Sequence, residues 1–214
     1  MQNPEDKITH AGAQNINPPP SQNTSPQRLL VGLTGASGAI LGIRLLEVLK
    51  PTTLETHLVL SDSARLTIQQ ETDWHVDDVL SLAHTHYDPD DIGAAIASGS
   101  FASIGMVIIP CSIKTLSAVA NSYTDDLISR AADVTLKEGR PLVLVVRETP
   151  YHPGHLRVMT DAARAGAIIF PPIPAFYIHP RSIDDLINNT VGRILARIGI
   201  QNDQYQEWQG RTGD

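Results

Sequence analysis

Polar loops rich in glycine, serine and threonine follow several apolar runs in this sequence. The loop Gly32-Leu-Thr-Gly35-Ala-Ser-Gly38 comes directly before a helical pattern, and free backbone N–H groups at the start of a helix favour a phosphate. Its spacing is G-x-x-G-x-x-G, so it lacks the G-x-G-x-x-G fingerprint of dinucleotide-binding folds. A tight glycine turn without a ligand explains the loop, taken alone, equally well. Ser61, after the next apolar run, could give a second hydroxyl to the same ligand.

Two further strand ends carry groups of the same kind. The loop Ser112-Ile-Lys-Thr115 opens a predicted helix, whose positive end offers hydroxyl and N–H groups to an anion. Ser112 taken singly is better explained as an N-cap. Arg147 and Glu148 follow another apolar run. An isolated Arg–Glu pair is more often a surface ion pair of little energetic weight, but its position at a strand end favours a ligand.

Cations that could hold a phosphate occur on two predicted helices. Arg130 and Lys137 are seven residues apart on one helix and therefore share a face. Such a face is usually solvated, although two cations also suit a phosphate, which carries about 1.5 to 2 negative charges. Arg193 lies on the last predicted helix, and the proline-rich loop 171–176 delivers the phenol of Tyr177.

Several other kinds of site are not indicated. Cys111 is the single cysteine, which excludes internal disulfides and multi-thiolate metal sites, and a buried thiol at a strand end is its simpler interpretation. The pairs His84/His86 and His152/His155 have no accompanying set of carboxylates, so no metal site is expected. The Tyr-x-x-x-Lys pair of short-chain dehydrogenases is absent, which disfavours a nicotinamide oxidoreductase.

The loops must be positioned by strands that alternate with helices. The predicted strands are 29–33, 54–60, 106–109, 142–146 and 167–170. The predicted helices lie between the glycine loop and residue 49, after residue 61, and at 114–122, 125–138, 153–165 and 182–198. Continuously apolar strands between helices are typical of a parallel sheet covered on both faces. We therefore expect a single-domain, doubly wound, Rossmann-like α/β fold with ligands at the carboxyl ends of its strands.

Composition agrees with one globular domain. The chain has 214 residues, 42% hydrophobic and 18% charged, with a formal net charge of −7 and no Lys/Arg-rich run. Nucleic acid is therefore not an expected partner. No apolar stretch reaches the ~18 residues of a membrane span and no signal peptide is recognisable, so we expect a cytoplasmic protein without a membrane partner. We expect a disordered tail at 1–27, the domain at 28–210 and a short C-terminal tail at 211–214.

The order and spacing of these motifs resemble the flavin prenyltransferases of the UbiX type. The resemblance runs from Arg28 to about Gly210. It rests on the segments GLTGASGA (32–39), Ser61, Glu71-Thr72, ASGS (97–100), PCSIKTLS (110–117), RAADVTLKE (130–138), RPLVLVVRETP (140–150) and PAFY (174–177).

The resemblance implies a reaction and its partners. Such enzymes bind reduced FMN and dimethylallyl phosphate, join the prenyl unit to N5 and C6 of the flavin, and release phosphate without a metal. The product, prenylated FMN, is the cofactor of a UbiD-type decarboxylase, for example in ubiquinone biosynthesis. The family usually assembles as a homododecamer with its sites at subunit interfaces.

The resemblance also implies which residues bind. FMN would be held by loop residues at four strand ends: Gly35, Ala36, Ser37, Ser61, Ser112, Ile113, Lys114, Thr115 and Arg147. The prenyl phosphate would be held by a phenol and cations, with a tryptophan closing over the site: Tyr177, Arg193, Lys137, Arg130 and Trp208. Lys137 and Arg130 would come from neighbouring subunits. Fixed cations would stabilise the charge that develops on the departing phosphate.

Four of the resembling residues would take part in catalysis. Lys137 would act on the departing phosphate. Glu71 would join the phosphate cluster, either sharing a proton or orienting Lys137. Glu148 would be the acid/base group for the flavin protons during ring closure, and Ser37 would position N5 or relay a proton.

Two alternatives stay open at this point. An FMN-dependent cysteine-peptide decarboxylase shares the expected fold and flavin, but it expects a catalytic histidine where this chain has Glu71-Thr72, and His75 is a poor substitute. A non-catalytic FMN carrier would need the flavin loops but not Glu148, Lys137 or Arg193.

Overall fold

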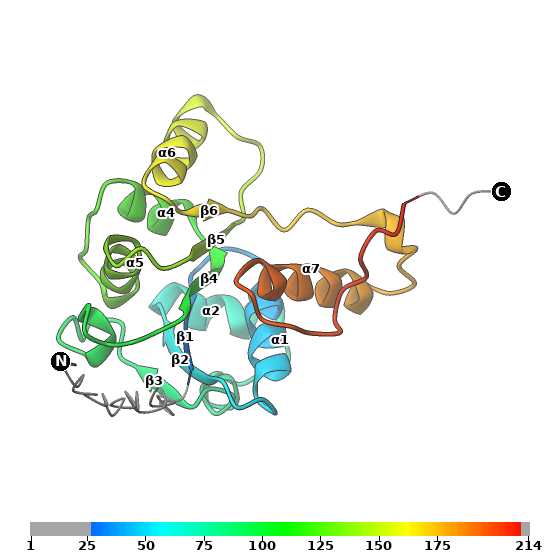
Figure 1. The fold of residues 1–214 in the computed structure, drawn as a ribbon, viewed down its shortest axis with the longest axis horizontal. Coiled ribbons are helices and arrows are strands. Elements are labelled where there is room, and N and C mark those ends of the chain that lie inside the picture. Colours follow the sequence, from blue (N-terminus) through cyan, green and yellow to red (C-terminus); the bar gives the residue numbers. More distant parts are fainter. Residues whose placement is uncertain (1–26, 211–214) are drawn as a thin grey trace, which may run out of the picture.

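A single parallel sheet forms the centre of the molecule (Figure 1). The computed structural model describes residues 27–210. Six strands lie in the order β3-β2-β1-β4-β5-β6, and every neighbouring pair is parallel. Their bounds are β1 Arg28–Leu33, β2 Glu55–Leu60, β3 Thr85–Tyr87, β4 Gly105–Cys111, β5 Leu142–Val146 and β6 Ile168–Ile169. The predicted doubly wound α/β fold is confirmed.

Helices cover both faces of the sheet (Figure 1). One apolar cluster packs the sheet against α1 (Ala39–Leu49), α2 (Asp62–Glu71), α3 (Val76–Leu80) and α7 (Ile183–Arg197). A second packs the other face against α4 (Ile113–Ala120), α5 (Leu127–Lys137) and α6 (Pro153–Arg164). Every residue of β4 and β5 is buried, which explains why these strands are apolar along their whole length and do not alternate.

The strand order reverses at β1. This strand pairs with β2 on one side and β4 on the other, so Gly32 lies between Val59 and Ile108. The chain adds β2 and β3 in one direction and β4 to β6 in the other. Loops after the two central strands therefore diverge, and the crevice between them at the carboxyl edge is where open α/β sheets bind ligands.

All five predicted strands and six predicted helices are present, with small shifts at their ends. The sequence analysis missed β3, α3 and the 3₁₀ turns Ala95–Ala97 and Phe176–Ile178. β3 has three residues, Thr-His-Tyr, of which Thr85 and His86 are exposed. An edge strand this short and polar has no apolar run by which to recognise it.

A long segment leaves the sheet after β6 and returns as α7 (Figure 1). The residues after α7 run back along this helix, and a side chain at Gly192 would place its Cβ 2.8 Å from the Tyr205 nitrogen. Residues 1–26 and 211–214, most of the two predicted tails, lie outside the described residues. Between residues 27 and 210, no helix is long and apolar enough to cross a membrane.

Candidate functional site

The Thr34 hydroxyl joins the two loops at the strand-order reversal. It donates to the Pro110 carbonyl oxygen at 2.8 Å and accepts from the Ser112 N–H at 2.8 Å. Thr34 is 2% exposed, so both bonds lie away from water and set the spacing of the loops. The sequence analysis did not assign Thr34 a role.

Close packing shapes the glycine loop. A side chain at Gly35 would put its Cβ 2.2 Å from the Cβ of Ser63, and Gly38 has a φ of +102°. Both positions therefore need glycine, the first for close approach to α2 and the second for its left-handed conformation. The loop thus lies against the start of α2, next to Ser61.

Glu71, at the end of α2, is bound to the glycine loop. Its carboxylate accepts the Gly38 N–H at 2.7 Å and the Ala39 N–H at 3.4 Å, and it also accepts a hydrogen bond from the Ser37 hydroxyl. Burial favours the neutral acid, but these three hydrogen bonds and the charge of Arg147 outweigh it and lower the pKa of Glu71. Glu71 is therefore a carboxylate at neutral pH.

This contact differs from one sequence expectation. The first N–H groups of α1 are occupied by Glu71, so the start of this helix is not free for a phosphate. Within one chain, Glu71 lies at Ser37 and Gly38, whereas Lys137 pairs with the carboxylate of Glu138 at 2.5 Å. The predicted role of Glu71 beside Lys137 concerns a lysine of a neighbouring subunit and stays a prediction.

Anion-binding groups remain around the glycine loop. The Gly35 and Ser37 N–H groups have no acceptor among the described residues. The Ser61 and Ser112 hydroxyls cap α2 and α4, accepting from the N–H groups of Ala64 at 3.1 Å and Thr115 at 3.3 Å. Both serines are N-caps, as the sequence predicts for Ser112. The Ser61 hydroxyl keeps a proton to donate, whereas the Ser112 hydroxyl also lies 3.2 Å from the Thr115 hydroxyl. The donor set fits the phosphate of a flavin nucleotide.

Two cavities adjoin beside this loop. One, of about 290 Å³, is lined by Ser37, Gly38, Arg147 and the apolar side of α7. The other, of about 250 Å³, is lined by Phe170, Asn189 and Arg193 with their neighbours. Thr190 lines both. Together they form a cleft with apolar walls and a cation at each end, which suits an aromatic ring system beside an anion.

Arg147 lines the cleft because β5 continues its pairing with β4, and Glu148 follows it in the chain. The Arg147 N–H donates to the Cys111 carbonyl oxygen at 3.1 Å. The half-buried Glu148 carboxylate accepts the Thr149 N–H at 2.9 Å. Cys111 itself is fully buried, and burial raises the pKa of its thiol, so the structural interpretation of this cysteine is confirmed.

Tyr177 and Trp208 contact each other, but neither lines the two cavities of the cleft. Their rings meet edge to face at 5.8 Å, and the Tyr177 hydroxyl donates to the Gln206 carbonyl oxygen at 3.2 Å. Tyr177 is 38% and Trp208 64% exposed. The pair joins the 3₁₀ turn Phe176–Ile178 to the residues that follow α7.

Lys137 and Arg130 lie apart from this cleft within one chain. Both are on α5, which covers the face of the sheet opposite α7 and Arg193. Lys137 ends α5 shortly before β5 begins, so it lies at the amino edge of the sheet. There it approaches Gly99, whose added Cβ would be 2.8 Å from the Lys137 Nζ, while the Arg130 Nε donates to the Ala97 carbonyl oxygen at 3.2 Å.

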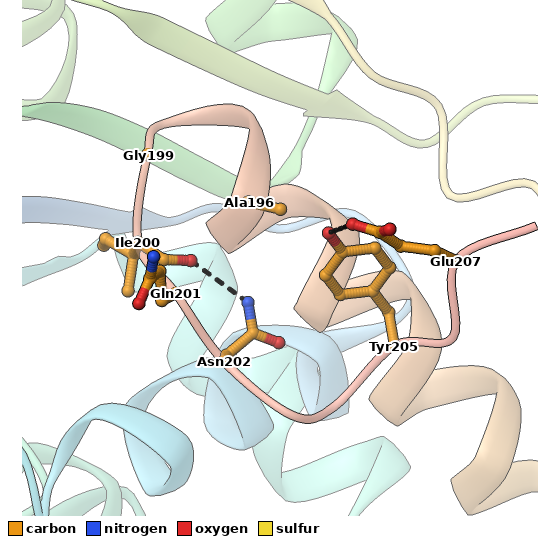
Figure 2. A pocket seen from close by; sticks show the side chains of 7 residues that line it. All are labelled: Ala196, Gly199, Ile200, Gln201, Asn202, Tyr205 and Glu207. Carbon is orange, nitrogen blue, oxygen red and sulfur yellow. Dashed lines mark hydrogen bonds between the residues drawn. The ribbon is translucent and has the colours of Figure 1, made fainter.

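Figure 2 shows a different cavity, of about 430 Å³, at the carboxyl end of α7. In it the Tyr205 hydroxyl donates to the Glu207 carboxylate at 3.1 Å. Among the seven residues that line it, Glu207 alone is charged. An acidic lining repels a phosphate, so this cavity is not the candidate site.

The sequence matches the family described as Flavoprotein over residues 18–195. The chain belongs to the flavoprotein family. Flavin prenyltransferase UbiX of Escherichia coli K12 is 58% identical over 187 residues, which cover 86% of this chain and 99% of that protein. Within the family, the chain therefore belongs to the flavin prenyltransferases of the UbiX type, enzymes that transfer a prenyl group to a flavin.

Two solved structures are similar along most of the chain. AnUbiX in complex with FMN and dimethylallyl pyrophosphate superposes with a TM-score of 0.86 at 49% identity, covering 87% of this chain and all of that one. A dodecameric FMN-dependent UbiX-like decarboxylase from Escherichia coli O157:H7 superposes with a TM-score of 0.84 at 47% identity, covering 86% and 100%. These relatives favour the prenyltransferase over the cysteine-peptide decarboxylase and the carrier.

Proposed function

We propose that this chain transfers the dimethylallyl group of dimethylallyl phosphate to N5 and C6 of reduced FMN, without a metal, to give prenylated FMN and phosphate. The observation that carries the proposal is the cleft of two adjoining cavities, with Ser37 and Arg147 at one end and Arg193 at the other. It can hold a flavin beside an allylic phosphate, and the similarity to a complex of FMN with dimethylallyl pyrophosphate supports the same pairing.

The flavin half of the cleft uses loop residues of one chain. We assign the FMN phosphate to the glycine loop with Ser61, and the rest of the nucleotide to the Ser112–Thr115 loop and Arg147. FMN supplies N5 and C6, the two atoms that the prenyl group joins. Ser37 lies between the Glu71 carboxylate and the 290 Å³ cavity, so it can position N5 or pass a proton to a base that is already ionised.

The phosphate half stabilises a leaving group. When the allylic C–O bond breaks, its electron pair leaves on the phosphate. Arg193, which lines the cleft, would stabilise that charge, and the resemblance to the family supports the same role for Tyr177. Lys137 and Arg130 would reach the same phosphate from neighbouring copies, because their own chain holds them on the other face of the sheet. A dodecamer, as in the similar structure from Escherichia coli O157:H7, provides such neighbours. Glu148 serves the flavin protons during ring closure.

The test is an anaerobic reaction of the purified protein with reduced FMN and dimethylallyl phosphate, followed by the mass of the extracted flavin. We expect one added C5 prenyl unit and released phosphate. A parallel reaction with dimethylallyl pyrophosphate distinguishes the donors. Unmodified FMN with either donor, where FMN binding is demonstrated, would contradict the function.

Two variants assign roles in the same assay. Glu148→Gln and Lys137→Ala should keep FMN binding and lose product, because each removes a charge from the reacting groups. Asp78→Asn is the matched control, since Asp78 is an exposed carboxylate on α3 outside both cavities. Product yields equal to those of the unmodified protein would reject the two assigned roles.

The destination of the product is a further part of the proposal. A UbiD-type decarboxylase is the recipient implied by the family, and the cytoplasm is the expected location. Adding the extracted product to such an apo-decarboxylase should restore its activity, whereas FMN should not.

A further inference from the structure

The cavity beside Arg193 has one apolar and one polar wall. Ile169, Phe170, Pro171 and Ile173 form the first, and Asn189, Thr190 and Arg193 of α7 form the second. The Thr190 hydroxyl donates to the Leu186 carbonyl oxygen at 2.7 Å, so it is paired within its own helix. The side chains of Asn189 and Arg193 have no such partner within residues 27–210.

Asn189 is buried without a partner. It is 3% exposed, and its Oδ1 has no hydrogen bond to any described residue. Its neighbour Asn188 differs, because the Asn188 Oδ1 accepts a hydrogen bond from Arg44. A buried amide oxygen without a donor destabilises a fold, so the position of Asn189 is not explained by packing alone.

Arg193, which is exposed, offers the complementary donors. It lies one helical turn after Asn189, at the spacing that places two side chains on the same face. Its guanidinium makes no hydrogen bond or ion pair within residues 27–210; its Cζ lies 6.0 Å from the centre of the Phe170 ring. A guanidinium offers five N–H donors, and the unpaired oxygen of Asn189 is an acceptor in the same cavity.

We propose that Asn189 is a positioning residue for Arg193: its Oδ1 accepts one guanidinium N–H when Arg193 turns into the cavity to bind the phosphate of the prenyl donor. The inference rests on the proposed function of the cleft. One N–H held by the amide leaves an edge of the guanidinium free for a bidentate contact with phosphate. Because an amide is neutral, it orients the cation without cancelling its charge.

The test measures binding without turnover. Dimethylallyl phosphate is titrated into the complex with oxidised FMN, and Kd is obtained by calorimetry. Asn189→Leu should weaken donor binding about tenfold or more, as expected for a hydrogen bond to a charged group. It should leave FMN affinity unchanged and the Tm equal or higher, since it removes a buried unpaired polar group.

Further variants separate positioning from packing. Asn189→Gln keeps an amide acceptor and should retain most of the affinity, whereas Asn189→Asp should weaken donor binding because its charge opposes the phosphate. In an Arg193→Ala background, Asn189→Leu should cause no additional loss. Asn188→Leu is the matched control: it should lower the Tm by removing the Arg44 contact and leave the donor Kd unchanged.

The outcomes distinguish this inference from the function on which it rests. If the unmodified protein binds no prenyl phosphate and makes no product, the proposed function fails, and the inference fails with it. If it binds and reacts normally, but Asn189→Leu leaves the donor Kd unchanged or weakens it equally without Arg193, the positioning role alone is wrong.

Discussion

The carboxyl and amino edges of the sheet differ in how their polar side chains find partners within one chain. At the carboxyl edge, Ser37 and Glu71 are joined by hydrogen bonds, and Thr34 ties the two loops together. At the amino edge, Lys137 forms an ion pair only with its sequence neighbour Glu138 among the described residues. Under the proposed assignments, one chain would supply the flavin half and Arg193, whereas Lys137 and Arg130 would come from a second copy.

The largest expected effect is the recovery of prenyl-transfer activity when two inactive variants are mixed. Lys137→Ala and Arg193→Ala each remove a cation from the leaving phosphate and should lower prenyl transfer ~100-fold or more. Co-expressed with different tags and purified through both, they should regain activity, since about a quarter of interface sites then combine an intact lysine with an intact arginine from two chains. The measurement is the rate of prenylated FMN formation per protomer.

A second mixture of variants serves as the control for this recovery of activity. Mixing Arg193→Ala with Tyr177→Phe should restore less activity, because both residues are assigned to the same chain's half of the site. If the Lys137 and Arg193 variants stay inactive together although mixed oligomers form, the two cations do not meet across an interface, and the comparison between the edges is wrong.

An effect of intermediate size, on stability and FMN binding, is expected at the carboxyl edge of the sheet. Thr34→Val is nearly isosteric but leaves the Ser112 N–H and the Pro110 carbonyl oxygen without their buried partner. We expect a loss of about 1–3 kcal/mol in the free energy of unfolding and weaker FMN binding as the loops separate. Urea denaturation and flavin titration measure the two. Thr34→Ser keeps the hydroxyl and should preserve both; unchanged stability and FMN affinity in Thr34→Val would show that the hydroxyl does not hold the two loops.

Much of the fold follows from the sequence because its signals are local. The apolar run 142–146 coincides with β5, and the N-cap Ser112 was recognisable from its position after a strand. Such features depend on neighbouring residues and on burial of both sheet faces. β3 was missed because an exposed edge strand carries no such pattern.

The site was only partly predictable because its contacts are distant in sequence. Glu71 was selected by resemblance, but its hydrogen bonds to Ser37 and Gly38 depend on how α2 returns to the glycine loop. The unpaired oxygen of Asn189 appears only when the packing of α7 is known. Residues that belong to a motif could therefore be selected from the sequence, whereas a residue marked by an unpaired hydrogen-bonding group could not.

The amino edge also holds a buried histidine whose environment differs from that of Glu71. His57 is 6% exposed and its Nδ1 lies 2.8 Å from the Tyr87 hydroxyl. Its Nε2 has no hydrogen-bond partner among the described residues and lies 3.9 Å from the Glu55 carboxylate. Burial lowers the pKa of His57 from its ordinary 6.5, and Arg28 and His84 act in the same direction while Glu55 opposes them.

The smallest predicted effect is a pH dependence at this histidine. Above pH 6.5 the imidazole is neutral in the folded and unfolded chain and contributes nothing to the pH dependence of unfolding. Below it the unfolded chain binds the proton more readily, so stability falls as the pH drops from 6.5 toward the lower folded pKa, by at most about 1.4 kcal/mol per pH unit. His57→Gln keeps a partner for Tyr87 and should reduce this loss between pH 7 and 5.5 in urea denaturation. His75→Gln, at an exposed histidine, should leave the loss unchanged. If both variants lose as much stability as the unmodified protein, protonation of other groups governs the acid sensitivity of the amino edge.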